Sequence, residues 1–380
     1  MEIAMAEAVV QKKKKRGRKA LTVALSAIAV IIIVAILFIT IVTRPVSDKS
    51  EKAVPVGGML TSDTIEYKSE SAKGLEHNAV IKLMQMIWRF CYDGDMAKHA
   101  DQTPPDVEML KDIPYMDDAN LYHQLDVFYP KDTAPNAELP VIIDIHGGGW
   151  MYATKDLNEY YCRALADRGF TVFSISYRLV PDVTVNEQIQ DSAAALKWIS
   201  ENMKNYPCDK NSIMLTGDSA GGQLALYSAV LAQSSELREI FETVDPEMDI
   251  DALLLTSPVP NMDTGALSIY TKTLWGKDYK DKATYKYMNA AAILDYAELP
   301  PTYLITSSGD SLAHDQTVAT AELLKKKGVA CTLKDYDKFN GKSLPHVFSV
   351  LYPFDEIGTQ TIDDALAFYK DVISQKTTVQ

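Results

Sequence analysis

Residues 212–222 read SIMLTGDSAGG, and this stretch decides the fold. The hydrophobic run from Ser212 to Thr216 is typical of a strand, and the residues from Gln223 onward favour a helix. Between them lies a Gly-x-Ser-x-Gly pattern, in which a tight turn holds Ser219 in strained backbone angles and small neighbours leave room for it. An ordinary glycine-rich turn before a helix can look the same, so the pattern needs support from elsewhere in the chain.

A second glycine-rich stretch gives that support. Residues 146–150 read HGGGW and directly follow a predicted strand, Val141 to Ile145. A run of glycines lets backbone N–H groups converge on one spot, where they stabilise the oxyanion formed when a serine attacks a carbonyl, by about 3 kcal/mol per donor. A phosphate-binding loop is disfavoured for two reasons. No Lys-Ser/Thr follows the glycines, and three adjacent glycines do not form a G-x-G-x-x-G motif. The expected oxyanion hole consists of Gly147, Gly148, Gly149 and Ala220.

A serine nucleophile needs a base, and the base needs an orienting acid. In folds that carry the serine on a Gly-x-Ser-x-Gly turn between a strand and a helix, the three follow in the chain order serine, acid, histidine. Asp310 follows the predicted strand Thr302 to Thr306, at the carboxyl end of the sheet where sites are built. The alternative acid, Asp315, lies at an expected helix start, where capping is the ordinary role of an aspartate. Of six histidines, only His346 lies beyond the last predicted strand. We predict that Ser219, Asp310 and His346 form a catalytic triad.

The remaining histidines have other expected roles. His146 belongs to the glycine loop, and His314 shares the loop of the acid. The others precede the core of the sheet and are expected at the surface or in a lid: His77, His99 and His123.

Short hydrophobic runs alternate with helical stretches beyond Asp112, which predicts an α/β fold with a mostly parallel sheet and helices on both faces. The predicted strands are Gln124 to Tyr129, Val141 to Ile145, Thr171 to Ser176, Ser212 to Thr216, Ala252 to Thr256, Thr302 to Thr306 and Cys331 to Tyr336. The predicted helices are Leu157 to Asp167, Asn186 to Met203, Gln223 to Ala232, Thr317 to Lys327 and Ile362 to Ser374. An amphipathic helix is also expected from Asn78 to about Lys98.

Together these motifs resemble the hormone-sensitive-lipase-like family of α/β-hydrolases. Its members carry an HGGG loop, a GDSAGG turn and a Tyr-Arg-Leu-x-Pro segment, which stands here as residues 177–181. The resemblance covers roughly residues 78 to 375. It implies the α/β-hydrolase fold, the triad and oxyanion hole named above, and a helical lid formed by residues 78–112 and by an aromatic insertion. Two positions depart from the family: Asp182 stands in place of Glu, and Val347 in place of Gly.

The aromatic insertion holds Tyr270, Trp275, Tyr279, Tyr285 and Tyr287. These rings could line an acyl pocket or simply pack the insertion, and the sequence leaves both readings open.

Charge distinguishes the N-terminus from the rest of the chain. The first 19 residues carry seven basic and two acidic side chains, so a net charge of -13 leaves the remainder at about -18 (-13 minus +5). An acidic body disfavours a nucleic-acid partner, which would need clustered Lys and Arg. The four cysteines form no C-x-x-C pair and have no histidine at ligand spacing, so neither a metal nor another cofactor is expected.

The residues from Ala20 to Val42 include 23 consecutive uncharged positions, enough to cross a hydrocarbon core of about 30 Å. The run is longer than the apolar region of a signal peptide, and no small-residue cleavage site follows it, which favours an uncleaved anchor over a secreted product. The basic cluster before it predicts a cytoplasmic N-terminus and an exported body. We therefore expect a tail (1–19), an anchor (20–42), a linker (43–75) and a hydrolase domain (76–380).

The predicted activity is hydrolysis of small acyl esters by a serine carboxylesterase, with a small-molecule substrate and a membrane as partners. A carbohydrate acetyl esterase or a peptidase could use the same triad. A non-catalytic scaffold is a further alternative, because fold and function are separable.

Overall fold

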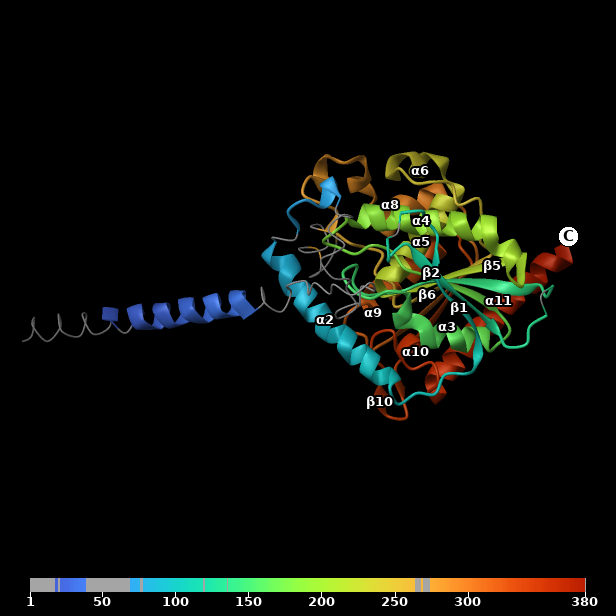
Figure 1. Cartoon of the computed structure of the whole chain (residues 1–380), viewed down its shortest axis with the longest axis horizontal. Helices are drawn as coiled ribbons and strands as arrows, with labels where there is room; N and C mark the ends of the chain where they lie inside the picture. Colours follow the sequence, from blue (N-terminus) through green and yellow to red (C-terminus); the bar gives the residue numbers. More distant parts are fainter. Residues whose placement is uncertain are drawn as a thin grey trace, which may run out of the picture.

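A computed structural model describes residues 18–19, 21–38, 69–75, 78–118, 120–134, 136–263, 268 and 274–379. Within the described N-terminal part, Leu21–Phe38 is a helix with a mean hydropathy of 3.1 (Figure 1). Its length and composition would allow it to cross a membrane or to serve as a signal sequence. The remaining described residues form one α/β body.

An eight-stranded sheet runs through this body in the order β1-β2-β4-β3-β5-β6-β7-β8. β2 alone runs opposite to the other seven strands, so the predicted mostly parallel sheet is confirmed. All seven predicted strands coincide with strands of the structure. The strands are β1 (Val107–Pro114), β2 (Gln124–Pro130), β3 (Leu139–Ile145), β4 (Thr171–Ile175), β5 (Cys208–Asp218), β6 (Ala252–Thr256), β7 (Thr302–Ser307) and β8 (Cys331–Tyr336).

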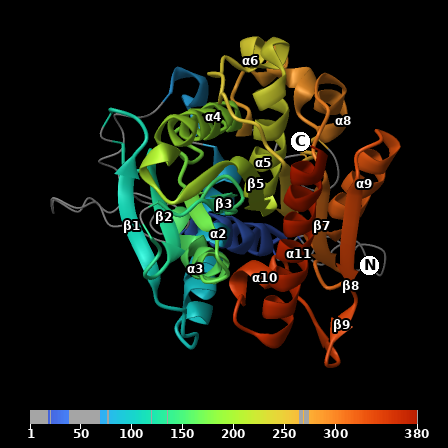
Figure 2. The ribbon, with the colours of Figure 1, turned by 90° about the vertical axis from the view of Figure 1, so that its right-hand side faces the viewer.

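Helices cover both faces of the sheet because successive strand residues point to opposite sides. In β3, Ile143 joins the apolar cluster under α4 and α5, whereas Ile142 joins the cluster under α3 and α11. Figure 2 shows the two layers on either side of the strands. The helices are α2 (Ala79–His99), α3 (Glu159–Ala166), α4 (Val185–Asn202), α5 (Ser219–Gln233), α6 (Ser235–Phe241), α8 (Ala290–Ile293), α9 (His314–Lys326), α10 (Phe348–Leu351) and α11 (Glu356–Val379).

The segment predicted to be a lid, residues 78–112, forms two different elements. Asn78 caps α2 by accepting hydrogen bonds from the backbone N–H groups of Val80 and Ile81, as its position before an amphipathic run would suggest. The last six residues of the segment, 107–112, belong to β1, an edge strand of the sheet with a bulge between Leu110 and Ile113. The lid prediction was therefore wrong beyond α2.

The last seven residues of the predicted linker pack on the body. The Ser69 hydroxyl donates to Glu187 Oε2 at 2.8 Å, and Ser69 N donates to the Asp182 carbonyl at 2.9 Å. Ala72 and Leu75 are buried. The folded body thus includes Ser69–Leu75, and the first part of the predicted linker lies outside the described residues.

Within the aromatic insertion, the described rings mostly serve packing. Trp275 and Tyr287 are buried and contact the ring of Phe241 in α6, with centroids 6.3 and 6.2 Å away. Tyr279 and Tyr285 contact each other edge to face. Tyr270 lies outside the described residues.

Candidate active site

The turn around Ser219 is tightly packed and strained. Ser219 lies where β5 passes into α5 and has a φ of 52°, which is costly for a residue with a Cβ and is often found at functional sites. A Cβ at Gly217 would lie 2.5 Å from the Gly221 carbonyl oxygen, and one at Gly221 would lie 2.0 Å from that of Ile145. The glycines are therefore required because other backbone occupies the space of a side chain.

The structure brings Asp310 and His346 together. Asp310 Oδ2 lies 2.9 Å from His346 Nδ1, and its other oxygen accepts from the backbone N–H groups of Leu312 and Ala313. Burial alone would raise the pKa of Asp310, but the contacts with His346 outweigh it and hold this pKa below its ordinary value. His346 Nε2 is buried and has no hydrogen-bond partner among the described residues. Asp310 therefore stays ionised and leaves one ring nitrogen of His346 available.

The loops that carry the acid and the histidine are packed directly against each other. A Cβ at Gly309 would lie 2.1 Å from Ser343 Oγ, and the Ser307 hydroxyl donates to the Leu344 carbonyl at 2.8 Å. Val347 has a φ of 50°, a left-handed conformation that favours glycine. This position is the one at which the sequence departs from the glycine of the family, so here a β-branched residue bears the strain.

The side chains of the other described histidines have other partners. His314 contacts Asp315 and Asp335, and Asp315 is fully exposed. His99, the last residue of α2, is buried and stacks on Tyr160, within the segment predicted to be a lid. His123 is buried between carboxylates directly before β2, so the expectation of a surface or lid position was wrong for it. His77 lies outside the described residues.

The glycine loop is held by Asp218, the residue before the serine. Gly147 N donates to Asp218 Oδ1 at 3.0 Å, and a Cβ at Gly147 would lie 2.3 Å from the other carboxylate oxygen. Gly148 has a φ of 111°, and its Cβ would lie 2.2 Å from the Tyr152 carbonyl oxygen. The loop and the serine turn are thereby fixed to each other.

Trp88 of α2 covers the end of this loop. A Cβ at Gly149 would lie 2.8 Å from the indole ring, which stacks on Tyr152 with centroids 5.7 Å apart. The buried Trp88 Nε1 has no hydrogen-bond partner within the described part of the chain. Helix α2 thus forms a wall beside the glycine loop through Trp88.

The Tyr-Arg-Leu-x-Pro segment packs against the glycine loop and supports it. The buried Tyr177 stacks on His146 and donates to the carbonyl oxygens of His146 and Gly147, at 2.9 and 3.0 Å. Burial lowers the pKa of His146 to about 4, so the ring is neutral at pH 7. His146 therefore lies against the loop as a neutral ring and supports it, with Nδ1 2.7 Å from the Gly147 carbonyl oxygen.

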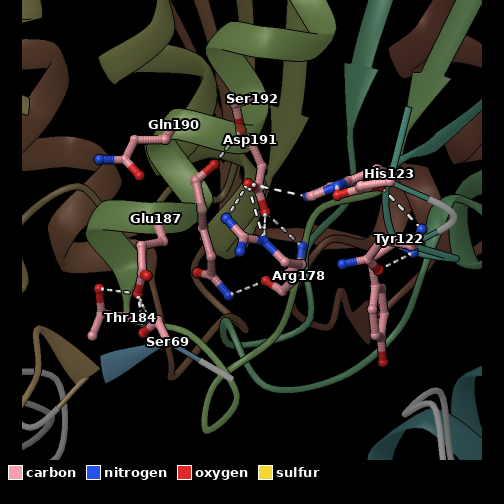
Figure 3. Close-up of polar contacts among 12 residues, drawn as sticks. Ser69, Tyr122, His123, Arg178, Thr184, Glu187, Gln190, Asp191 and Ser192 are labelled. Carbon is pink, nitrogen blue, oxygen red and sulfur yellow. Dashed lines mark hydrogen bonds and ion pairs between the residues drawn. The ribbon is translucent and has the colours of Figure 1, made fainter. Parts of the chain in front are cut away.

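Arg178 anchors this segment through a buried charge network (Figure 3). Its guanidinium donates to both carboxylate oxygens of Asp191, and His123 lies between Asp191 and Asp118. Burial alone would raise the pKa of Asp191, yet His123 and Arg178 lower it to about 2. The network fixes the start of the segment to α4 through the ion pair of Arg178 with Asp191.

Two buried carboxyl groups lie beneath the loop and share one amide. Asn158 Nδ2 donates to Asp218 Oδ1 at 2.8 Å and to Asp144 Oδ2 at 3.1 Å. Burial raises the pKa of Asp144 to about 7, and the neighbouring charge of Asp218 adds to the effect. Burial also raises the pKa of Asp218, to about 6. The pair therefore keeps a proton at pH values where exposed carboxyl groups have lost theirs.

We expect Asp144→Asn to remove a pH dependence of stability. Folded Asp144 holds its proton to about pH 7, whereas the unfolded residue loses it near pH 4, so this group makes the parent less stable as pH rises between those values. The free energy of unfolding of the variant minus that of the parent should increase over this range, by up to about 1.4 kcal/mol per pH unit. Urea titrations of residues 44–380 at several pH values would measure it, and a difference independent of pH would contradict it.

Sequence reasoning missed several residues of this site. Trp88 was part of an expected amphipathic helix, but nothing in its spacing pointed to Gly149. Asn158 carried no signal. Asp144, an acid inside the apolar strand VIIDI, could have been found, because a charge in a buried strand needs a partner.

The sequence profile of a family described as alpha/beta hydrolase fold matches residues 142–348, more than half of the chain. The chain belongs to this hormone-sensitive-lipase-like family. The match spans the glycine loop, the serine turn and the loops of Asp310 and His346, so the resemblance inferred from the motifs is confirmed.

Similar proteins are esterases. Carboxylesterase NlhH of Mycobacterium tuberculosis is 29% identical over 55% of this chain and 67% of its own length. Neutral cholesterol ester hydrolase 1 of Pongo abelii is 31% identical over 43% of each chain. The crystal structure of esterase B from Lactobacillus rhamnosis superposes with a TM-score of 0.75 at 32% identity, covering 80% of this chain and 98% of that one. This family member is accordingly a hydrolase that acts on ester bonds.

Proposed function

We propose that this protein is a serine carboxylesterase in which Ser219 is the nucleophile, His346 the general base and Asp310 the orienting acid. The observation that carries the proposal is the Asp310–His346 hydrogen bond, which leaves a buried Nε2 without a partner in the described structure. A base that serves a serine needs one ring nitrogen oriented by an acid and the other free for the hydroxyl proton.

In the proposed reaction, Ser219 Oγ attacks the ester carbonyl while His346 takes its proton. The developing oxyanion accepts hydrogen bonds from backbone N–H groups of Gly148, Gly149 and Ala220. Gly147 N is already bonded to Asp218, so its role is to hold the loop. His346 then protonates the departing alcohol, and a water molecule activated by His346 releases the acid from the serine.

Hydrolysis of p-nitrophenyl esters, from acetyl to palmitoyl, tests this function. Residues 44–380 are expected to cleave the shorter esters, and Ser219→Ala should lower kcat by about 10⁶-fold, as for removal of a nucleophile from a triad. Both proteins should give the same urea midpoint, which would show that the variant is folded. Equal rates in the two proteins, or no hydrolysis in either, would contradict the proposal.

We further propose that Leu21–Phe38 is part of an uncleaved anchor, with the basic tail in the cytoplasm and the hydrolase domain outside. The hydropathy of the helix supports a membrane anchor, and the basic residues before it support this orientation. In intact cells, external protease should remove a C-terminal epitope from the full chain and leave an N-terminal one. A protected C-terminus would contradict the orientation, and a shortened product in the medium would contradict the anchor.

A further inference from the structure

Helix α2 is apolar on two sides, although the body needs only one of them. On the inner side, Ile81 is fully buried, and Met84 and Trp88 pack against the core. On the outer side lie Val80, Leu83, Ile87 and Phe90, with exposed fractions of 40, 40, 40 and 60%. Their spacing of three, four and three residues puts them on one line along the helix, which we name the α2 stripe.

A line of four large exposed apolar side chains is unusual on a soluble protein and marks a contact surface. Elsewhere on the described body, the exposed large hydrophobic residues are separated from one another in the chain. α2 runs along one side of the body, away from the C-terminal end of α11 (Figure 1). The α2 stripe is therefore a candidate interface that the sheet and its helices leave uncovered.

The position of α2 in the chain favours a bilayer as its occupant. Residues 39–68 separate the apolar helix Leu21–Phe38 from Ser69, and α2 begins ten residues after Ser69. Even fully extended, those 30 residues would reach at most about 100 Å, so the anchor keeps the body near the membrane. The free energy of inserting an apolar helix face into the lipid interface then acts on a body that is already tethered.

The inner side of α2 connects this surface to the chemistry, because Trp88 covers Gly149 of the glycine loop. The glycine loop and the α2 stripe therefore lie against the same helix, which is about 10 Å wide with its side chains. We propose that the α2 stripe lies in the interface of the membrane, so that Ser219 receives acyl esters dissolved in the lipid phase. This inference rests on the two proposals above, that the protein is an esterase and that its N-terminal helix is an anchor.

Depth-dependent quenching tests the contact independently of any activity. The full chain would be reconstituted into phosphatidylcholine vesicles with plain or brominated acyl chains, carrying Phe90→Trp or, as the matched control, Val244→Trp. Val244 is 49% exposed and follows α6 on another side of the body. Brominated lipid should reduce the added fluorescence at position 90 by more than half and leave that at position 244 unchanged. Equal intensities at position 90 in both lipids would overturn the proposal.

Other occupants would give different results. If a second copy covered the α2 stripe, the fluorescence intensity at position 90 would change with the protein-to-lipid ratio and would be the same in plain and brominated lipid. If another segment of the same chain covered it, neither variable would matter. Either result would overturn the proposal.

Activity provides a second arm with its own control. Leu83→Gln combined with Ile87→Gln should lower hydrolysis of a long-chain ester dissolved in the vesicles by about tenfold, with the rate on soluble p-nitrophenyl acetate unchanged. Equal rates of parent and variant on the vesicle ester would overturn the route through the lipid phase. Absence of soluble activity in the parent would instead be a failure of the esterase proposal, and the quenching arm would still decide the contact.

Discussion

Asp310→Asn is expected to lower kcat about 10⁴-fold on any ester that the parent cleaves. The amide can still lie beside His346 Nδ1, but it brings no charge to stabilise the imidazolium that forms when Ser219 loses its proton. It can also donate to Nδ1, which favours the tautomer with the proton on the wrong nitrogen. KM should change little, because the carboxylate does not touch the ester.

Asp315→Asn is the matched control for this prediction. Asp315 is five residues away, is fully exposed and contacts His314 rather than His346. Steady-state kinetics of the two variants of residues 44–380 would separate the candidates. Normal activity in Asp310→Asn together with a large loss in Asp315→Asn would show that the wrong acid was chosen.

Gly221→Ala should destabilise the fold strongly and impair catalysis as well. Its Cβ would lie 2.0 Å from the Ile145 carbonyl oxygen and 2.3 Å from that of His146, and both belong to backbone that cannot rotate away. We expect a loss of about 3 kcal/mol in the free energy of unfolding. Because the strand end carries the glycine loop, displacement of these carbonyls should also misalign the oxyanion hole and lower kcat by about 10²-fold.

Gly94→Ala supplies the comparison, since it adds the same methyl group to another helical glycine. No atom lies within 4 Å of a Cβ at Gly94, so alanine should stabilise α2 by up to about 1 kcal/mol. Urea unfolding and ester hydrolysis of both variants would measure the contrast. Similar stability in the two variants would contradict the packing described for the serine turn.

The sequence predicted the interior strands because their burial leaves long apolar runs, as in VIIDI and SIMLT. Strand β1 was not predicted, because VEMLKDIP lacks a regular alternation of apolar and polar residues. It pairs through its backbone at the edge of the sheet, and the bulge interrupts the two-residue period of its side chains. Asp310 and His346 could be predicted because loops after parallel strands meet at one edge. The contact of Trp88 with Gly149 could not, because it depends on how α2 folds back over the sheet.

The departure at Val347 shows what a sequence comparison alone leaves open. A missing glycine suggests a different local path of the chain, yet Val347 has the left-handed conformation that favours glycine, and His346 contacts Asp310. The strain is tolerated because Val347 is buried in an apolar cluster with Phe348 and Leu351. Burial of the valine side chain offsets part of the backbone cost.

Strand β1 has a consequence for aggregation. The free side of an edge strand can accept a strand from another molecule and start an intermolecular sheet. Here the bulge twists that side, Asp112 has a φ of 59°, and Lys111 is held by Glu159 and Asp156 in the adjoining segment. Strand addition would have to break these ion pairs and flatten the bulge, so fibrillar assembly should begin from partly unfolded chains rather than from the folded esterase.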